Sequence, residues 1–443
     1  MRFTVTALLI IIVLFLLPVT ALFAAELYDL GCWWTAMKEG RLLFARHRNP
    51  TLDPVLKTYE LYLFDPATGV ITFLQKPGEK LPLLPAVSPD GTALAYYAIV
   101  EGNDYLVTRY LDEGRSIRLR FDTGGYIEAV ALDYDRDRVL TANKRGEDRQ
   151  ALYLISNRQG TIRRILNGTR FQDIHFLANG GVQYTDLKDG RLVLGVVHPW
   201  NLKQTVLSGM TRLALASPRG DAVLFREFDR LSLYRVNSGE TIRISDQVSA
   251  DPLVSPEGTT CAVFEPDALL LVNLPTGDVM YYLALAADTR SSLLNDFSFY
   301  TVRGRSIHRI MHRNPGQQLA ELYRGEGALR LLAVSGDDRF VYFQEGTGEG
   351  GVGTNSVTVL DRTTGESVVK RFPFAVEEVL PLRVRASDGS FYIRALGEVP
   401  GDRVPVRELY YYSMPMGALI GVSTARDADL DLYRRKQGSS RGS

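Results

Sequence analysis

The five histidines are the first residues to test for chemistry, because metal binding and general acid–base catalysis both draw on imidazole. His308 and His312 stand four residues apart in SIHRIMHRN. In an extended strand this spacing puts both rings on one face, but about 13–14 Å apart, too far for one metal ion. No HExxH pattern accompanies them. We interpret the pair as surface or core histidines and predict no metal site.

Alternating carboxylates are the second candidate. Asp133, Asp135 and Asp137 occupy alternate positions of LDYDRDR. An extended segment would carry all three on one side, and such oxygen ligands suit calcium. Two arginines are interleaved with the carboxylates. We therefore favour a solvated turn, with a calcium site as the alternative.

A glycine-rich segment, EGTGEGGVGTN at 345–355, has the composition of a phosphate-binding loop. Such a loop must open a helix whose N-terminal amides face the anion. Here the strand-like RFVYFQ precedes the glycines, SVTVLD follows them, and Glu349 would repel an anion. The segment is predicted to be a loop between two strands, without a bound cofactor.

Nucleophilic catalysis has no better support. The chain lacks the GxSxG pattern that marks the nucleophile of serine hydrolases. Cys261 alternates with apolar neighbours in TTCAVFE and is expected in the core, and the spacing does not support a bond to Cys32. We predict that the protein is not an enzyme.

The charge balance excludes one class of partner. Lys and Arg number 51, as do Asp and Glu, in a chain of 443 residues. Nucleic-acid binding needs a basic field, which this balance does not provide. The one local imbalance is the polar YRRKQGSSRGS at the end of the chain, and we predict a disordered tail over 424–443.

The first 25 residues carry a targeting signal. MRFTVTALLIIIVLFLLPVTALFAA has one arginine, a long apolar run and Pro18. Val19-Thr20-Ala21 fits a small-x-small cleavage site, which predicts a signal peptide over 1–21. The run is also long enough for an uncleaved anchor over 1–25. Either way we expect export to a periplasmic or extracellular location, with membrane contact only through this segment if it is retained.

The elements that would have to position these residues form a repeat, clearest in AVSPDGTALAYYA at 86–98. Between two apolar strands, Pro89 fixes a bend, Asp90 can bond its own backbone, and Gly91 accepts positive φ. Arg219 and Glu257 replace Asp90 in the next clear copies, so Asp90 is predicted to be a turn former. These copies are ALASPRGDAVLFREF (214–228) and PLVSPEGTTCAVFEP (252–266), with weaker ones at 131–144, 176–187, 332–346 and 384–396.

A second hairpin with a glycine-containing turn follows the copies, as in LSLYRVNSGETIRIS and LLLVNLPTGDVMYYL. Four short strands, a to d, recurring with a period near forty residues are typical of a β-propeller blade. Nine b strands are expected to begin at Leu42, Thr92, Arg138, Val182, Ala222, Thr260, Phe297, Arg339 and Ser390. The first unit lacks a clear opening strand, and rings often close by combining strands from both termini. We therefore predict an all-β fold, a single propeller of four-stranded antiparallel blades over 41–423 with eight blades, seven or nine being the alternatives.

The repeat resembles that of the PD40 or TolB-type propellers, in which a strand ends in S-P-D-G before a strand such as L-A-Y. SPRGDAVLF and SPEGTTCAVF share this pattern, and DPATG, LPTG and DRTTG are similar to the c–d turns of the superfamily. The resemblance covers 41–423 and implies a scaffold, a receptor or part of an enzyme. It also implies a periplasmic protein that binds envelope partners. The sequence departs from TolB itself in showing no sign of the separate N-terminal α/β domain.

Loop lengths predict where a partner binds. In an a–b–c–d meander the a–b and c–d turns lie on one face of the ring and the b–c and d–a loops on the other. The turns are short, whereas b–c loops are long at 46–59, 345–355 and 396–408. Long loops on a rigid scaffold are typical of binding sites. We predict a binding face near the ring closure, with loop-length variation without function as the alternative. The candidate contacts are Arg46, His47, Arg48, Glu349 and Arg403.

The sequence thus predicts a non-catalytic exported propeller that binds a protein or a cell-envelope component, with no nucleic acid, metal or cofactor. The alternative is a propeller enzyme, or one that binds a carbohydrate or another small ligand in its central channel. Such a site needs converging polar groups, but the a strands are mostly apolar, as in TRLALAS. A quinone-binding propeller needs tryptophans in its repeats, whereas Trp33, Trp34 and Trp200 lie elsewhere.

Overall fold

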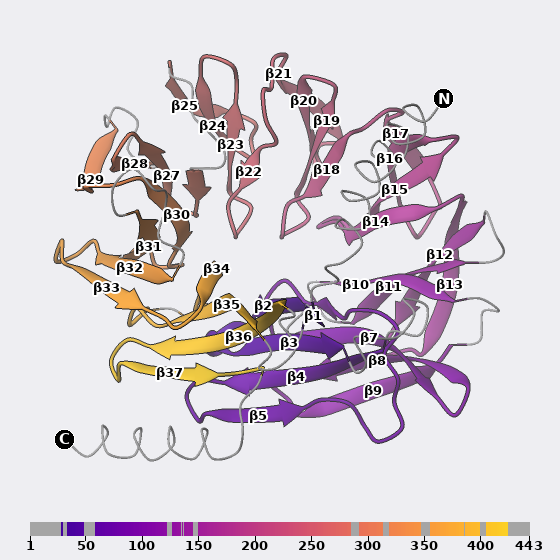
Figure 1. Cartoon of the computed structure of the whole chain (residues 1–443). Helices are drawn as coiled ribbons and strands as arrows, with labels where there is room; N and C mark the ends of the chain where they lie inside the picture. The colour runs from indigo at the N-terminus through magenta and orange to yellow at the C-terminus, as the bar shows by residue number, and fades with distance from the viewer. Residues whose placement is uncertain are drawn as a thin grey trace, which may run out of the picture.

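The computed structural model describes residues 28–29, 33–47, 58–121, 126–133, 135, 137–144, 149–284, 292–312, 319–346, 355–384, 386–398 and 405–423. Within these residues the chain forms nine sheets, arranged around one central opening (Figure 1). Eight sheets have four antiparallel strands, and the ninth has four antiparallel strands and one added parallel strand. Each sheet is one blade, with its strands in chain order from a, next to the centre, to d at the rim.

The strands of the blades follow in the order a, b, c, d. Blade 1 consists of β2 (Trp33–Ala36), β3 (Leu42–His47), β4 (Tyr59–Asp65) and β5 (Val70–Phe73). Blade 2 consists of β6 (Ala86–Val87), β7 (Ala93–Val100), β8 (Asn103–Tyr110) and β9 (Arg115–Arg120). Blade 3 consists of β10 (Ile127–Leu132), β11 (Arg138–Lys144), β12 (Gln150–Ser156) and β13 (Thr161–Gly168). Blade 4 consists of β14 (Phe171–Phe176), β15 (Val182–Lys188), β16 (Arg191–Val197) and β17 (Gln204–Ser208). Blade 5 consists of β18 (Leu213–Ala216), β19 (Ala222–Glu227), β20 (Arg230–Arg235) and β21 (Glu240–Ser245). Blade 6 consists of β22 (Leu253–Val254), β23 (Thr260–Phe264), β24 (Leu269–Asn273) and β25 (Val279–Leu283). Blade 7 consists of β26 (Ser292–Leu294), β27 (Ser298–Arg303), β28 (Ser306–Met311) and β29 (Ala320–Arg324). Blade 8 consists of β30 (Leu329–Val334), β31 (Phe340–Glu345), β32 (Ser356–Asp361) and β33 (Ser367–Arg371). Blade 9 consists of β34 (Ala375–Pro381), β35 (Phe391–Glu398), β36 (Pro405–Ser413) and β37 (Ala418–Gly421).

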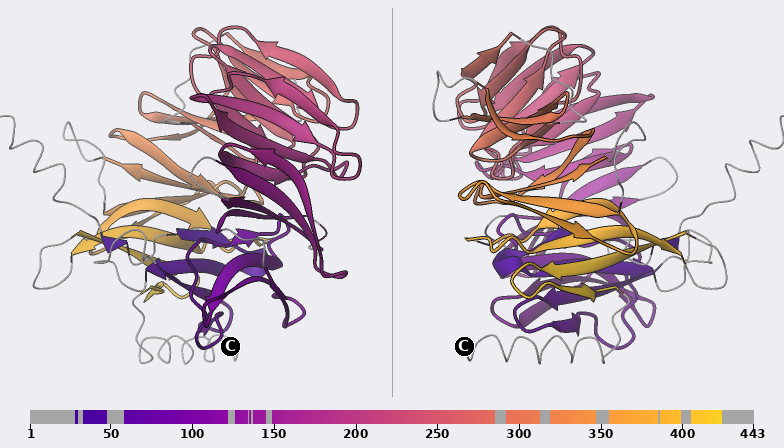
Figure 2. Two further views of the ribbon diagram at one scale, coloured as in Figure 1. Left: turned by 90° about the vertical axis from the view of Figure 1, so that its right-hand side faces the viewer. Right: turned by 60° about the vertical axis from the view of Figure 1, so that its left-hand side comes forward.

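The core is divided among the contacts between blades. The described residues form nine hydrophobic clusters, each joining two consecutive blades, the ninth with the first included. Apolar residues on both faces of the central strands supply them, as the fully buried β23 shows. A blade alone would leave both faces in water, so stacking around the ring is what buries the apolar surface. Figure 2 shows the blades stacked in this way.

The a–b turns are held by a serine. In blade 5, Oγ of Ser217 accepts hydrogen bonds from the amides of Asp221 at 3.0 Å and Ala222 at 3.1 Å. Ser88, Ser255 and Ser335 repeat this arrangement in blades 2, 6 and 8. The side chain thus satisfies backbone donors that the tight turn leaves without partners.

The turn glycines also set the distance between blades. Gly220 has φ +69°, and a Cβ there would lie 2.6 Å from the carbonyl oxygen of Phe176 in blade 4. Its own carbonyl accepts a hydrogen bond from Ala178 at 2.8 Å. Gly258 approaches Pro218 of the preceding blade in the same manner. The glycine of the S-P-x-G turn therefore serves both the turn and the contact with the preceding blade.

Acids near the ends of b strands tie down the linkers from the preceding blade. Glu265 accepts a hydrogen bond from Ser245 Oγ at 2.6 Å, and Glu345 accepts one from the amide of Glu326 at 2.7 Å. Glu227 accepts one from Ser208. The signal in the sequence is an aromatic residue followed closely by an acid, as in LFREF, VFEP and YFQEG.

The preferred number of eight blades was wrong, and the described residues form nine, which was one of the two alternatives. Blade 1 has its own a strand, the short β2, and blade 9 has its own a to d strands, so neither blade takes one of its four strands from the other end of the chain. The N-terminal β1 (Tyr28–Asp29) instead pairs in parallel with β36 at the edge of blade 9. Side-chain contacts complete the closure, since Tyr392 Oη donates to the carbonyl of Gly40 at 2.7 Å.

The described residues include one short helix, η1 (Lys38–Gly40), in the a–b turn of blade 1. None of the helices among them has the length and apolarity to cross a bilayer. The predicted signal peptide or anchor and the predicted tail lie outside the described residues.

Candidate functional site

The predicted loop-face contacts are described in part. Arg46 lies near the end of β3, opposite Glu60 of β4 in the strand register. Its guanidinium lies 5.8 Å from the ring centroid of Tyr62. His47 is the last residue of β3. Arg48, Glu349 and Arg403 lie outside the described residues. The structure therefore places two of the five candidates at the b–c end of blade 1.

The other chemistry-bearing residues lie apart from one another. His308 is in β28, and His312 is buried just beyond its end. Cys261 is fully buried between blades 5 and 6, as predicted, and burial raises the pKa of its thiol. Among the described residues, no three His, Cys, Asp or Glu side chains come together as a metal site would require.

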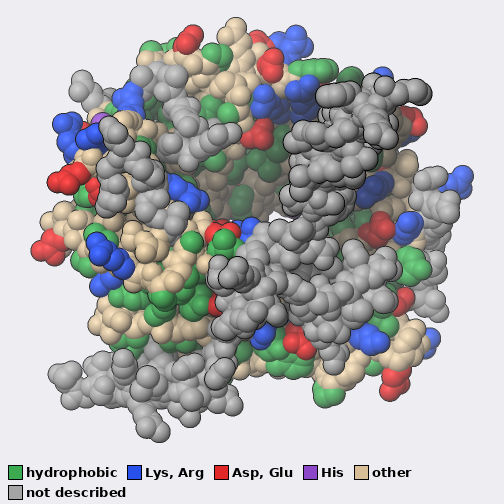
Figure 3. Space-filling model, viewed as in Figure 1, with side chains coloured by type: hydrophobic (Ala, Val, Ile, Leu, Met, Phe, Trp, Pro, Cys, Tyr) green, Lys and Arg blue, Asp and Glu red, His purple; other side chains and the backbone are tan. Residues whose placement is uncertain are grey.

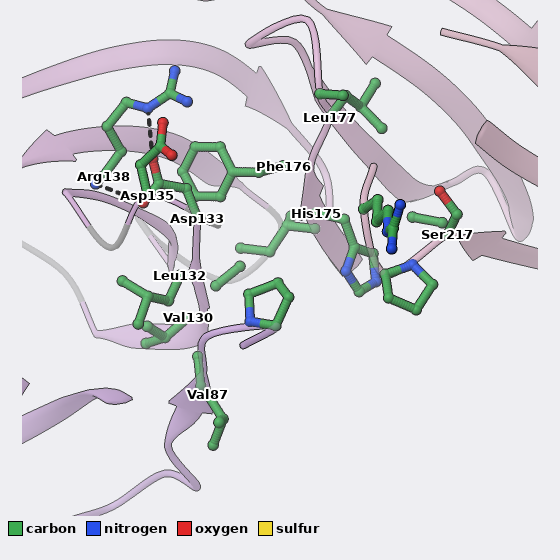
Figure 4. A pocket seen from close by; sticks show the side chains of 18 residues that line it. Val87, Val130, Leu132, Asp133, Asp135, Arg138, His175, Phe176, Leu177 and Ser217 are labelled. Carbon is green, nitrogen blue, oxygen red and sulfur yellow. Dashed lines mark hydrogen bonds and ion pairs between the residues drawn. The ribbon is translucent and has the colours of Figure 1, made fainter. Parts of the chain in front are cut away.

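A cavity of about 570 Å³ lies at the turn end of the central channel. The ends of the a strands and the a–b turns of blades 2 to 5 line it (Figure 4). Much of its wall is apolar, including Val87, Val130, Leu132 and Phe176. Figure 3 shows hydrophobic side chains deep in the central hollow. Four blades that each contribute one strand end thus create a concave, partly apolar surface that no single repeat contains.

The polar side of the cavity comes from blade 3. Asp133 takes the place of the turn serine, and its carboxylate accepts the amide of Arg138 at 3.0 Å and Nε of the same residue at 2.8 Å. The Arg138 guanidinium also lies 5.3 Å from the ring centroid of Phe176. These contacts fix the guanidinium through Nε, while neither Nη atom has a hydrogen-bond partner among the described residues. The carboxylates of LDYDRDR do not converge, because Asp137 instead accepts the amide of Arg158 at 3.1 Å.

His175 is a titratable group on the channel wall. Although His175 is exposed at the channel surface, partial desolvation by the surrounding strands lowers the pKa of its imidazole, and the nearby Asp173 acts in the opposite direction. A neutral imidazole can both donate and accept a hydrogen bond. Ser217 also lines the cavity, but its hydroxyl is engaged in the turn. The arrangement therefore suits binding, with an apolar floor and a fixed guanidinium at the edge.

Sequence reasoning gave a central-channel site only as the alternative and did not identify these residues, because it placed the binding face on the long loops. The cavity is lined by short elements whose approach depends on the curvature of the ring. One signal was available: Asp133 and Arg138 stand where the clear repeats have serine and a small uncharged residue, alanine or threonine. A repeat that departs from its own turn pattern indicates a site with an additional role.

No family model and no curated protein matches the chain. Among solved structures, it is similar to a eukaryotic initiation factor at 12% identity and a TM-score of 0.50, with 78% of this chain and 89% of that chain covered. It is also similar to TolB from Acinetobacter baumannii at 17% identity and a TM-score of 0.35, over 53% of this chain. The similarity spans 61% of the length of that TolB structure. An oligogalacturonate lyase in complex with manganese matches at 12% identity and a TM-score of 0.41, with 66% of this chain and 88% of that chain covered. TolB-type propellers are thus among the similar structures, and at these identities the similarity concerns the fold.

Proposed function

We propose that this protein is a non-catalytic, exported propeller that binds a protein or another component of the cell envelope. The observation that supports this most is the cavity of about 570 Å³ at the turn end of the channel. Its apolar floor and fixed Arg138 suit an inserted protein segment with apolar and acidic groups. The resemblance of the repeats to PD40 and TolB-type propellers supports the same class of function.

Rigidity also favours a scaffold. Consecutive blades are joined all round the ring by hydrophobic clusters. A preorganised surface loses little conformational entropy when it binds. The loop face around Arg46 and His47 remains a second candidate surface for the same function.

A small ligand in the channel is the second candidate function. The cavity volume lies within the range of about 300–1,000 Å³ that is common for ligand pockets. Mass spectrometry of small molecules released from the purified, denatured protein tests it. A stoichiometric compound would favour this candidate over a protein partner at the same site.

Site-specific photo-crosslinking in the producing cells tests the proposal. The crosslinking amino acid replaces Asp135, which lines the cavity, Arg48, which the sequence predicts to be a loop-face contact, or the exposed Asp229 in the b–c turn of blade 5. We expect protein adducts from position 135 and none from position 229. Adducts from position 48 alone would show that the partner binds at the loop face and not at the cavity. The absence of adducts from all three would overturn the proposed function.

A further inference from the structure

The c–d turns of the ring share one glycine. Seven of the eight described c–d turns have a glycine with positive φ at the equivalent position, and these are Gly69, Gly114, Gly160, Gly239, Gly277, Gly365 and Gly417. Blade 4 is the exception, with Leu202 at φ +58°. Leu202 is equivalent because its amide donates to the carbonyl of His198 at 2.8 Å, as that of Gly160 donates to Ser156 at 2.9 Å.

The leucine is unfavourable at this position for the fold. An L-residue with a branched side chain rarely adopts positive φ, because its Cβ crowds the backbone. Burial does not offset this strain, since Leu202 is 44% exposed. Trp200, two residues earlier in the same turn, is 67% exposed. The turn therefore presents two large apolar side chains to solvent, and Leu202 stands where the other turns have glycine. Such departures cluster at functional sites.

Two hydrogen-bond donors converge next to this turn. A Cβ on Gly180 would lie 3.6 Å from Nη1 of Arg138 and 3.7 Å from Nε1 of Trp200. In the part of the chain that the structure describes, neither nitrogen has a hydrogen-bond partner. Gly180 carries no side chain, so both N–H groups border the space above it. A guanidinium and an indole N–H around one small space suit a carboxylate.

The charges around the turn favour an acidic partner. Arg163 donates to the carbonyl of Trp200 at 3.5 Å, and Lys203 follows Leu202 directly. Of the nearby acids, Asp133 is already paired with Arg138. Asp135 lines the cavity (Figure 4), and its carboxylate would repel a second one there. We therefore expect an incoming carboxylate on the Trp200 side of the guanidinium.

We propose that Trp200, Leu202 and Arg138 form a docking surface, the Trp200 platform, for a segment of a partner protein in which a large apolar residue adjoins a carboxylate. The apolar side chain packs on Trp200 and Leu202, and the carboxylate accepts hydrogen bonds from Trp200 Nε1 and Arg138 Nη1. This inference rests on the protein-binding function proposed above, and it specifies the chemistry of the partner segment. Exposed tryptophan and arginine are the residues most often found at the energetic centre of protein interfaces.

Peptide selection tests the platform. The purified full-length chain selects from a phage library of random seven-residue peptides, and the selected peptides are synthesised and titrated. We expect them to pair an acidic with a large apolar residue, and Trp200→Ser to weaken their binding at least about tenfold. Arg138→Gln is expected to remove the preference for the acidic residue. Equal binding to W200S, or a selection without peptides that distinguish it from the wild type, would overturn the platform.

Leu202→Gly is the matched variant, because it restores the residue of the other c–d turns. We expect its melting temperature to equal or exceed that of the wild type, while peptide affinity falls. A structural role alone would leave the affinity unchanged. If the cross-links from position 135 persist in W200S and L202G with undiminished yield, the proposed function stands and the platform fails.

Discussion

At the scale of single residues, Asp338 shows how one side chain joins two blades. It lies in the a–b turn of blade 8 with φ +62° and is 3% exposed. Its carboxylate forms ion pairs with Arg309, and with Arg362 at 2.9 Å. The other donors to it are Asn295 Nδ2 at 2.7 Å, Tyr300 Oη at 2.6 Å and Ser298 Oγ at 3.0 Å. The carboxylate is thus fully hydrogen-bonded, mostly by residues of blade 7.

Asp338→Ala is expected to destabilise the fold by about 3–5 kcal/mol, because it leaves two partly buried arginines without their shared carboxylate. The midpoint of urea unfolding, followed by circular dichroism, measures the effect. Asp267→Ala, at an exposed turn position, is the control and should change stability by less than about 0.5 kcal/mol. Similar midpoints for the two variants would show that the network contributes little.

The histidines make stability depend on pH. Desolvation lowers the pKa of His175, and desolvation with Arg303 lowers that of His308. The unfolded chain protonates both near about pH 6.5, whereas the folded chain resists protonation. Because the unfolded state then binds more protons, stability falls as the pH drops below about 6.5.

The double variant H175Q/H308Q is therefore expected to lose less thermal stability than the wild type between about pH 7.5 and about pH 5.5. Melting temperatures at the two pH values measure this, and H175Q alone should give an intermediate loss. An equal loss in the wild type and the double variant would assign the pH dependence to other groups.

At the scale of elements, the S-P-x-G turn is both a local structure and a contact between blades. Proline, serine and glycine define the turn locally, which is why the sequence predicted it. The predicted b-strand starts agree with the structure to within one residue. The approach of Gly220 to the backbone of Phe176 was not predictable, because it depends on how two sheets stack.

Gly220→Ala is expected to destabilise the ring by about 2 kcal/mol or more, since its Cβ would meet a carbonyl oxygen and its φ is positive. Gly190→Ala is the matched control, with φ +72° and no atom within 4 Å of the added Cβ. It isolates the conformational effect of about 1 kcal/mol. Equal losses of unfolding free energy in the two variants would rule out an effect of the contact between blades.

At the scale of the whole molecule, the ring closes between blade 9 and blade 1, each of which has its own four strands. The a–b turn of blade 1 lies between its neighbours, because Gly40 donates to Arg383 O at 3.3 Å and Lys38 donates to Gly91 O at 3.3 Å. Arg383 in turn donates to the carbonyl of Pro89 at 3.1 Å. These turn contacts add to the hydrophobic cluster that joins blades 9 and 1, and β1 pairs at the edge of blade 9.

The N-terminal segment gives a prediction at the same scale. If residues 1–21 are a signal peptide, the mature protein in its producing cell begins at Leu22. N-terminal sequencing of protein from the envelope or medium measures this, and cytosolic protein accumulated during a block of export is the control. A mature chain that still starts at Met1 in the membrane fraction would identify the segment as an anchor.

The sequence by itself determined the class of fold and the repeating unit, because alternating apolar residues and turn-forming residues act over a few neighbouring positions. The tertiary structure decided the number of blades, since β2 is a strand only through its pairing with β3 inside a closed ring. It also decided where the cavity lies and which side chains surround Gly180. Arg138 and Trp200 stand 62 positions apart in blades 3 and 4, and only the stacking of those blades brings both nitrogens to one glycine.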